Sequence, residues 1–376
     1  MFDHEVIVVG GGAMGAATAW QLARAGRDVA LVEQFEVGHV HGSSHGHTRI
    51  FRIAYRDPRY SAFALAALDW WRVLEDESAS SLVELCGQID HGAPAALDDV
   101  AIALDHLGRP HQRLSAAAAA RRWPGIRTAG GALFSPDGGY VAADRSVATL
   151  HRVAAERGAT IHTGVAVRRI EPAADGGGAT VVTDDGSWSA PVVVVAAGAW
   201  AGGLLDGLVD LPPLTVTLAV PSHFRPVPAA GSDRGDPWPS VVHYAPDGAP
   251  LGFGAYAVWA PGVGMKVGLE EREIPVDLAR RRYDPPPEEV AALAAYVREW
   301  FPGLDPDPLD PHTCLFTSTP DEHFILDRRG PVVVVSPCSG HGFKFVPAVG
   351  QVAAAMALSS DPTAADVDRL DAWRLT

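Results

Sequence analysis

The part of the sequence that most constrains the fold is residues 5–33, which read as a strand, a glycine-rich turn, a helix and a second strand. EVIVV is a continuous apolar run, as expected for a parallel strand that is buried on both faces. GGGAMG follows it, and then comes a stretch with helical spacing that stops at Gly26. DVALVE supplies the second strand. This order predicts a βαβ unit at the start of the chain.

The glycine-rich turn fits the pattern G-x-G-x-x-G at Gly10, Gly12 and Gly15. The first glycine permits a tight turn, the second lets the backbone approach a pyrophosphate, and the third lets helix and strand pack closely. The first N–H groups of the following helix are free to bind phosphates. Glu33 ends the second strand, where a carboxylate can accept hydrogen bonds from a ribose 2′-hydroxyl. The pattern predicts dinucleotide binding, and the acid disfavours NADP without separating NAD from FAD.

Later segments extend this pattern. APVVVVAAGAW and PVVVVS read as buried strands, and the first should return the chain to the N-terminal sheet. Helices are expected at about 61–77 and 144–158 and in the segments PEEVAALAAYVREWF and PAVGQVAAAMALSS. A further Ala-rich helix is expected after Ser115, whose side chain should cap its N-terminus. Residues 214–269 are strand-like and punctuated by Pro and Gly, which predicts an antiparallel sheet.

The expected fold class is therefore α/β, with a Rossmann-like dinucleotide-binding domain interleaved with an α+β substrate domain built on an antiparallel sheet. A chain of 376 residues is long enough for both. The expected boundaries are 1–82, 143–215 and 318–376 for the dinucleotide-binding domain, and 83–142 and 216–317 for the substrate and catalytic domain.

Charge and cysteine content limit the expected partners and location. A net charge of −15 argues against nucleic acid or an anionic membrane, which need basic surface, although a few local cations can still bind a small anion. Three cysteines, Cys86, Cys314 and Cys338, do not make a disulfide framework. The sequence shows no signal-peptide pattern and no apolar run of the roughly 18 residues that a membrane span needs. We expect a reduced, cytoplasmic monomer.

A second polar segment, HVHGSSHGHTRIFRIAY at residues 39–55, is rich in Gly, Ser and His, so it is expected to be a functional loop. Metal binding is one interpretation of His41, His45 and His47. No cysteines or carboxylates at suitable spacing complete a metal shell, so we favour a polar loop around an anionic ligand and expect no metal. Arg49 and Arg52 suit bidentate recognition of a carboxylate or phosphate.

The segment SPCSGHGFKF directly follows a buried strand, at the edge of an open α/β sheet where ligands bind. It contains His341 and Lys344. Lysine is scarce, because Lys266 and Lys344 are the only two among 30 basic residues. The scarcity suggests specific roles for both, although an overall preference for Arg would produce it as well.

The glycine motif with its acid, SSHGHTRIFR, CLFTSTPDEHFILD and SGHGFKF together resemble the monomeric sarcosine oxidase family, which includes N-methyltryptophan oxidase and the fructosyl-amino-acid oxidases (amadoriases). The resemblance spans nearly the whole chain in the same order. It implies an FAD-dependent amine oxidase that acts on an N-substituted α-amino acid, a secondary amine, and reduces O2 to H2O2. The dinucleotide-binding domain would then be the FAD-binding domain.

The resemblance also implies how FAD is held. Cys314 matches the cysteine that is joined through a thioether to the 8α carbon of FAD, which would raise the flavin potential and prevent loss of the flavin. Besides Gly10, Gly12, Gly15 and Glu33, the implied cofactor contacts are Ser43, His45, Thr48, Gly340, Gly342 and Lys344.

Substrate and catalytic roles are implied in the same way. Arg52 and Lys344 match the clamp for the substrate carboxylate. Arg49 matches the basic residue close to the flavin face, and His341 lies near the flavin in the family's pocket. Lys266 matches the lysine that lies over flavin N5 and activates oxygen.

Three positions depart from the sarcosine oxidase pattern. Four residues after Lys266 this chain has Glu270 instead of His, as fructosyl-amino-acid oxidases do, and there the acid contacts the amine and sugar of the substrate. Leu251 stands in place of a tyrosine, and His47 in place of an aspartate. Glu270 therefore favours a fructosyl amino acid as substrate, unless it only pairs with Lys266 or Arg272.

Other interpretations stay open. One alternative is an oxidase of sarcosine or of other N-methyl or cyclic secondary amino acids. Two others are an NAD-dependent dehydrogenase, which would be colourless, and a flavin-binding protein without catalytic activity. The sequence does not identify the exact substrate, the group that accepts the amine proton, or the role of Cys338.

Overall fold

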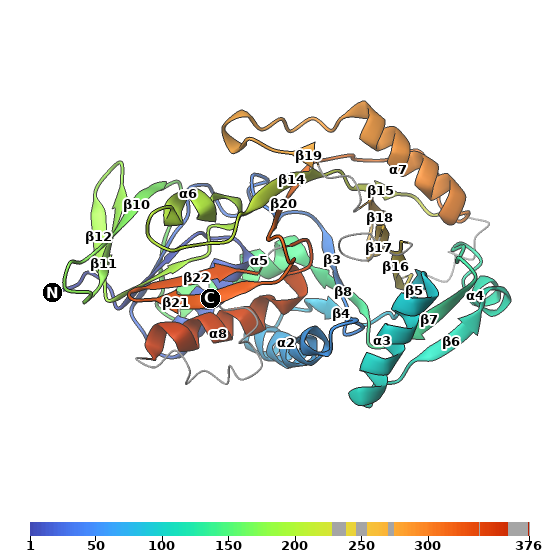
Figure 1. Cartoon of the computed structure of the whole chain (residues 1–376), viewed down its shortest axis with the longest axis horizontal. Coiled ribbons are helices and arrows are strands. Elements are labelled where there is room, and N and C mark those ends of the chain that lie inside the picture. The colour runs from blue at the N-terminus through green and yellow to red at the C-terminus, as the bar shows by residue number, and fades with distance from the viewer. Residues whose placement is uncertain (228–237, 246–253, 270–273, 338, 360–374, 376) are drawn as a thin grey trace.

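The computed structural model describes residues 1–376 except 228–237, 246–253, 270–273, 338, 360–374 and 376 (Figure 1). Three residues named above, Leu251, Glu270 and Cys338, therefore lie outside the described residues. Figure 1 shows a helix-covered sheet at one end of the long axis and a second sheet, with α7, at the other.

The first sheet has the strand order β21-β22-β13-β1-β2-β9. Its neighbours run parallel except for β21, which is antiparallel to β22. β13 pairs with β1 from Val192 to Val195, which confirms that the chain returns to the N-terminal sheet. The strands are β1 (Val6–Val9), β2 (Val29–Val32), β9 (Thr160–His162), β13 (Val192–Val195), β21 (Ile325–Arg329) and β22 (Val332–Ser336).

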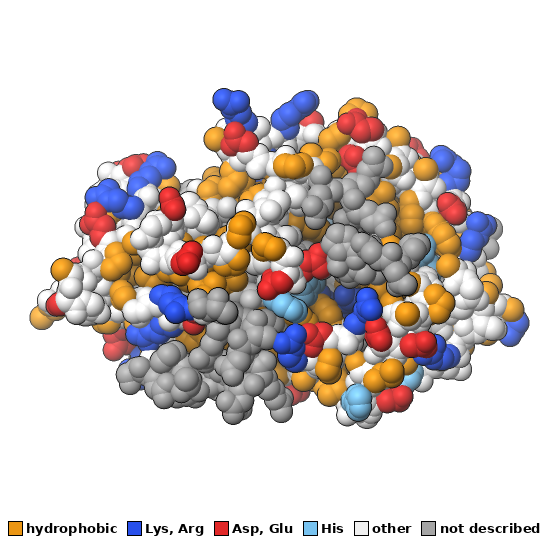
Figure 2. Space-filling model, in the orientation of Figure 1, with side chains coloured by type: hydrophobic (Ala, Val, Ile, Leu, Met, Phe, Trp, Pro, Cys, Tyr) orange, Lys and Arg blue, Asp and Glu red, His pale blue; other side chains and the backbone are white. Residues whose placement is uncertain are grey.

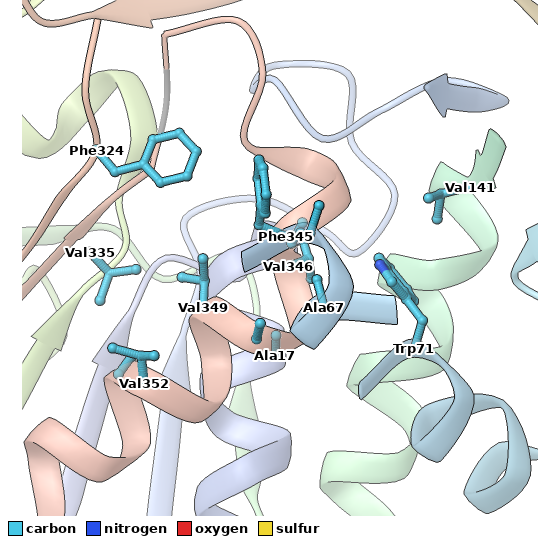
Figure 3. Packing of buried hydrophobic residues seen from close by; sticks show 14 of the residues in the cluster. Ala17, Ala67, Trp71, Val141, Phe324, Val335, Phe345, Val346, Val349 and Val352 are labelled. Atoms are coloured by element: carbon cyan, nitrogen blue, oxygen red, sulfur yellow. The ribbon is translucent and has the colours of Figure 1, made fainter. Parts of the chain in front are cut away.

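Helices cover one face of this sheet. The residues at the crossing of α1 and α8 are small: a Cβ atom on Gly350 would lie 2.7 Å from the Cβ atom of Ala17. Figure 3 shows Ala17 near α8, with Ala67 and Trp71 of α2 on the other side of Val346. The Trp71 indole donates a hydrogen bond to the backbone oxygen of Lys344 at 2.8 Å, so α2 helps to fix that segment. The helices are α1 (Ala13–Arg24), α2 (Pro58–Ser78), α5 (Ala143–Glu156) and α8 (Val346–Leu358).

Alternate residues of the same strands point to the opposite face, as the period of a strand requires. There Ile7, Ala30 and Val193 pack with a small sheet and a short helix in a second apolar cluster. These elements are β10 (Val167–Pro172), β11 (Ala179–Thr183), β12 (Ser187–Ala190) and α6 (Ala201–Leu205), which follows a 3-10 turn at Gly198–Trp200.

The second large sheet has the order β15-β18-β17-β16-β5-β7-β6. It is antiparallel as predicted, except that β16 and β5 run parallel. These two strands come from distant parts of the chain, so no hairpin turn sets their direction. The strands are β5 (Gln88–Gly92), β6 (Gln112–Ser115), β7 (Gly131–Ser135), β15 (Ser222–Phe224), β16 (Ser240–Tyr244), β17 (Ala255–Ala260) and β18 (Gly264–Leu269).

Three helices accompany this sheet. Leu293 and Val297 of α7 pack with Met265 and Val267 of β18. Ser115 caps α4 by accepting a hydrogen bond from the backbone N–H of Ala118 at 3.2 Å, as the sequence predicts. The helices are α3 (Pro94–His106), α4 (Ala116–Arg122) and α7 (Pro287–Trp300), with a 3-10 turn at Leu278–Arg280.

Two small sheets join the larger ones. One is β3-β8-β4, built from β3 (Thr48–Phe51), β8 (Gly139–Ala142) and β4 (Val83–Glu84). The other is β19-β14-β20, built from β19 (Ile274–Pro275), β14 (Thr215–Ala219) and β20 (Cys314–Ser318). The reading of residues 39–55 as one loop was therefore wrong at Thr48–Phe51, because Thr, Ile and Phe favour a strand and β8 supplies the partner.

The predicted α/β fold, with a parallel sheet and a largely antiparallel one, is confirmed, while the domain boundaries stay a prediction. Among the described residues, we find no helix with the length and apolar character to span a bilayer. On the face shown in Figure 2, acidic and basic side chains are interspersed over the surface.

Candidate active site

The glycine-rich turn connects β1 to α1 beside the end of β13. Gly10 has φ of +103°, and a Cβ atom there would lie 2.5 Å from the backbone oxygen of Ala196. A Cβ atom on Gly15 would lie 1.8 Å from the backbone oxygen of Gly10. Only glycine fits at these two positions, and the turn therefore brings bare backbone to the start of α1.

Glu33 lies directly after β2 and is buried beside this turn. Its Oε2 accepts a hydrogen bond from the backbone N–H of Gly11 at 2.6 Å, and Oε1 accepts one from Phe35 at 2.9 Å. The two bonds fix the carboxylate, and each oxygen keeps a lone pair for a further donor. The structure thus places Glu33 beside the glycine turn, with acceptor positions left for a ligand hydroxyl.

Arg49 fixes the loop that precedes β3. Its Nη2 donates to the backbone oxygens of Ser43 at 2.9 Å and His45 at 2.6 Å, and its Nη1 donates to that of Thr48 at 3.0 Å. Nη2 also lies 3.9 Å from Sγ of Cys314, the first residue of β20. The guanidinium therefore places a positive charge against the buried thiol.

Lys266 reaches the same place from β18. Its Nζ donates a hydrogen bond to the backbone oxygen of Thr48, the acceptor that Arg49 also uses. The side chain is only 2% exposed. Burial holds the pKa of Lys266 well below its usual value, and the neighbouring Arg49 lowers it further.

A second cluster surrounds Tyr55. The Arg52 guanidinium carbon lies 4.3 Å from the centre of the Tyr55 ring, and Lys344 Nζ donates to the Tyr55 hydroxyl at 2.8 Å. Lys344 also donates to the backbone oxygen of His341 at 2.7 Å. All of these side chains are buried. Two cations are thus held against one phenol.

His341 completes this cluster as a neutral ring. Burial and the charge of Lys344 hold the pKa of His341 well below its usual value. Its Nε2 lies 3.3 Å from the backbone oxygen of Glu322, which can only accept, so Nε2 carries the proton. Nδ1 is then the acceptor for the Tyr55 hydroxyl at 3.3 Å.

Tyr55, Tyr244 and Asp90 were not predicted as site residues. Arg52 Nη1 donates to the Tyr244 hydroxyl at 3.2 Å, and Tyr244 is hydrogen-bonded to Asp90, a fully buried acid on β5. Burial raises the pKa of Asp90 to about 7, against the opposing charge of Arg52. Tyr55 could have been found from the sequence, because it ends the segment that contains Arg49 and Arg52. Asp90 could not, because no local pattern in the sequence pairs it with these residues.

A cavity of about 460 Å³ runs from the glycine turn to β20, within the roughly 300–1,000 Å³ that small-molecule and cofactor sites occupy. Predicted residues that line it are Gly10, Gly12, Glu33, Ser43, Arg49 and Cys314. Gly340, Gly342 and Phe343 line it from the C-terminal segment. Arg49 lies 5.7 Å from the Phe343 ring, and Phe343 begins the 3-10 turn (Phe343–Phe345) that contains Lys344, so the Tyr55 cluster adjoins the cavity.

Residues 5–356 match the family described as FAD dependent oxidoreductase. The chain belongs to this family. Among its relatives, it is 31% identical to a monomeric sarcosine oxidase of a Bacillus species, covering 94% of this chain and 92% of that one. It is also 31% identical to an N-methyl-L-tryptophan oxidase of Yersinia pestis, covering 94% and 95%.

Solved structures agree with this assignment. The oxidoreductase superposes on NikD, described as an unusual amino acid oxidase essential for nikkomycin biosynthesis, with a TM-score of 0.85 and 28% identity over 98% of this chain and 96% of that one. A fructosyl amine:oxygen oxidoreductase (amadoriase I) of Aspergillus fumigatus gives a TM-score of 0.77 at 21% identity, over 99% and 89%, a likeness that shows the fold alone. The predictions of a flavin-dependent enzyme and of FAD as cofactor are confirmed.

The residues of this oxidoreductase fit FAD. Gly10 and Gly12 of the glycine turn line the cavity, so that backbone without side chains faces it. In or beside the cavity-lining segments, His45 Nε2, Thr48 Oγ1 and Thr317 Oγ1 are buried without a hydrogen-bond partner among the described residues. A flavin ring carries several donors and acceptors that such atoms require. In the part of the chain that the structure describes, no group of three or more His, Cys, Asp or Glu side chains could hold a metal ion.

Proposed function

We propose that this oxidoreductase oxidises an N-methyl or cyclic secondary α-amino acid and passes the electrons to O2, forming H2O2. The observation that carries the proposal is the buried Arg52–Tyr55–Lys344 cluster beside the FAD cavity. A buried cluster that contains two cations favours an anionic ligand, and a substrate carboxylate is such a ligand. The names of the relatives, sarcosine oxidase and N-methyl-L-tryptophan oxidase, support the same substrate class.

The fructosyl amino acid expected from Glu270 is less well supported than this alternative. Glu270 lies outside the described residues, so no contact argues for a sugar at that place. The amadoriase likeness concerns the fold, whereas the relatives with about 31% identity are named for N-methyl amino acids. We also propose a monomer with small-molecule partners, in keeping with the name of the Bacillus relative.

Bound FAD supplies the two-electron oxidation of a CH–NH unit to C=N. The protein binds the substrate carboxylate at Arg52 and Lys344 and so fixes its position. Because His341 Nε2 is held by the Glu322 backbone oxygen, Nδ1 stays an acceptor and orients the Tyr55 hydroxyl. Burial raises the pKa of Tyr55 to about 12, with Arg52 opposing, so the phenol keeps its proton and does not neutralise either cation. The substrate amine must be neutral to be oxidised, and the released imine is hydrolysed by water.

A substrate comparison tests the proposal. The purified yellow protein is expected to release H2O2 with sarcosine, N-methyltryptophan or pipecolate, and to give little or none with fructosyl-valine or fructosyl-lysine. Turnover confined to the fructosyl compounds would restore Glu270 as the residue that selects the substrate. A yellow protein that is inert with every secondary amine would instead indicate a flavin-binding protein without catalytic activity.

Arg52→Ala is expected to raise the KM for the amino acid about 10- to 100-fold, because one charged hydrogen-bonding group contributes roughly 1.5–3 kcal/mol. Steady-state kinetics at fixed O2, with circular dichroism to verify folding, measure this effect. The control is Arg56→Ala, since Arg56 pairs with Asp99 on the surface at 2.8 Å. An unchanged dependence of the Arg52→Ala rate on substrate concentration would remove Arg52 from the clamp.

A further inference from the structure

Lys266 has a neighbour for which the proposed reaction has no role. His223 on β15 is its direct partner across the antiparallel β15–β18 pair. Directly opposed residues project from the same face of a sheet, with Cβ atoms about 5 Å apart. His223 is 1% exposed. The histidine and the lysine are therefore buried side by side.

Asp310 holds this histidine. Both Asp310 carboxylate oxygens lie 2.9 Å from His223 Nδ1, and Oδ1 also accepts a hydrogen bond from the His223 backbone N–H at 3.0 Å. Nδ1 is therefore the donor, and Nε2 is an acceptor. Nε2 is buried and has no hydrogen-bond partner among the described residues. Burial alone would raise the pKa of Asp310, but the hydrogen bonds from His223 hold it below its usual value, so the carboxylate is ionised at neutral pH.

Three histidines of this region, His45, His223 and His312, carry little charge. Burial lowers the pKa of His223 to about 4 and that of His45 to about 3, and it lowers the pKa of His312 as well. The His47 ring, which stands where sarcosine oxidases have an aspartate, packs edge-on to His223 at 5.2 Å. The chain thus has no acid at position 47. An acid of this region is Asp310, which is hydrogen-bonded to His223.

Few anions in the described part of the chain remain to balance Lys266. The titratable groups that face it or its immediate neighbours are His45, His47, Arg49, Asp144, His223, Asp310, His312 and Cys314. Of these, Asp144 is held by the backbone N–H of Gly46 at 2.6 Å. Cys314 loses its ionisable thiol once it is joined to FAD. Among the residues that the structure describes, Asp144 and Asp310 are then the two negative charges near Arg49 and Lys266.

We propose that Asp310, oriented by His223, is a counter-ion that acts together with Asp144 to keep Lys266 protonated. Asp310 and His223 are positioning residues, because they act on the reaction through the lysine. The inference deepens the proposed function. It rests on the proposed function in one respect only, namely that Lys266 is a cation when O2 reacts. The charge state of Lys266 itself can be measured without turnover.

The two lysines make the test direct. In the FAD-loaded protein labelled with 13Cε-lysine, NMR should show two lysine signals, and Lys344→Met assigns them. Asp310→Asn is expected to move the titration midpoint of Lys266 to lower pH by on the order of half a pH unit. The shift is small because Asp310 is partly exposed and solvent screens its charge. The Lys344 signal should not move.

Two variants of His223 separate positioning from general damage. His223→Asn keeps a donor for Asp310, so the Lys266 titration should stay within about 0.2 pH unit of the native one. His223→Phe fills the space without a donor, releases Asp310 towards solvent, and should reproduce the shift of Asp310→Asn. Asp99→Asn, which removes a surface acid paired with Arg56, should leave both lysines unchanged.

An unchanged Lys266 signal in Asp310→Asn would overturn the inference, and so would equal shifts of both lysines. The proposed function fails differently. If the Lys266 titration moves but the pH dependence of the O2 reaction does not follow it, Asp310 is a counter-ion and Lys266 is not the group that serves O2.

Discussion

Replacing Lys266 by methionine is expected to slow the reaction of the reduced enzyme with O2 by on the order of 10²–10³-fold. Lys266 is 2% exposed and is bonded to the backbone oxygen of Thr48, next to Arg49 and Cys314 at the cavity. A fixed cation there stabilises negative charge that develops on oxygen, and methionine keeps the shape without the charge. Anaerobic reduction by substrate should change little, because the substrate clamp is a separate cluster.

Stopped-flow measurement of the two half-reactions tests this prediction, and the other lysine is the matched control. Lys344→Met should weaken substrate binding and leave the reaction with O2 nearly native. Because burial lowers the pKa of Lys266, the native rate with O2 should fall as pH rises, at a pH below that of an exposed lysine. Lys266→Met should lack this step, and a native rate with O2 in this variant would refute the role of Lys266.

We propose a covalent bond between Cys314 and FAD, and Cys314→Ala is expected to abolish it completely. Acid precipitation of the native protein should leave the yellow colour in the pellet, whereas the variant should release all of its flavin. Cys314 Sγ is buried, lines the cavity, and lies 3.9 Å from Arg49 Nη2. The thiol is therefore placed at the wall of the cavity that we assign to FAD.

Cys86→Ala is the matched control for the flavin bond. The Cys86 thiol donates to the backbone oxygen of Trp238 at 3.4 Å, and burial raises its pKa to about 11. Its removal should leave flavin retention unchanged. Flavin that acid releases from the native protein would show that no covalent bond forms, whatever the activity.

Local patterns were sufficient for the framework of the site. β1, the glycine turn, α1 and β2 lie where the apolar run and the glycine spacing predict them. The periods of strand and helix and the positive φ at Gly10 are properties of the local backbone, so a short segment is enough to indicate them. The cap at Ser115 is equally local. The family is also recognisable from short segments, since each contains several specific residues in fixed order.

The choice of substrate shows the limit of a local pattern. Glu270 suggested a sugar because fructosyl-amino-acid oxidases have an acid at the same place. One matching residue does not say what else lines the pocket. The relatives named for N-methyl amino acids outweigh it.

The sequence by itself determined the βαβ unit, the family, FAD and the residue types of the site. Only the tertiary structure decided which side chains meet: Lys344 and Tyr55, 289 residues apart, and His223 with Asp310 behind Lys266. It also decided that β16 runs parallel to β5, and so where Asp90 lies. The physical reason is that the period of a strand fixes which face a residue occupies, whereas the partner strand and register follow from packing of the whole chain.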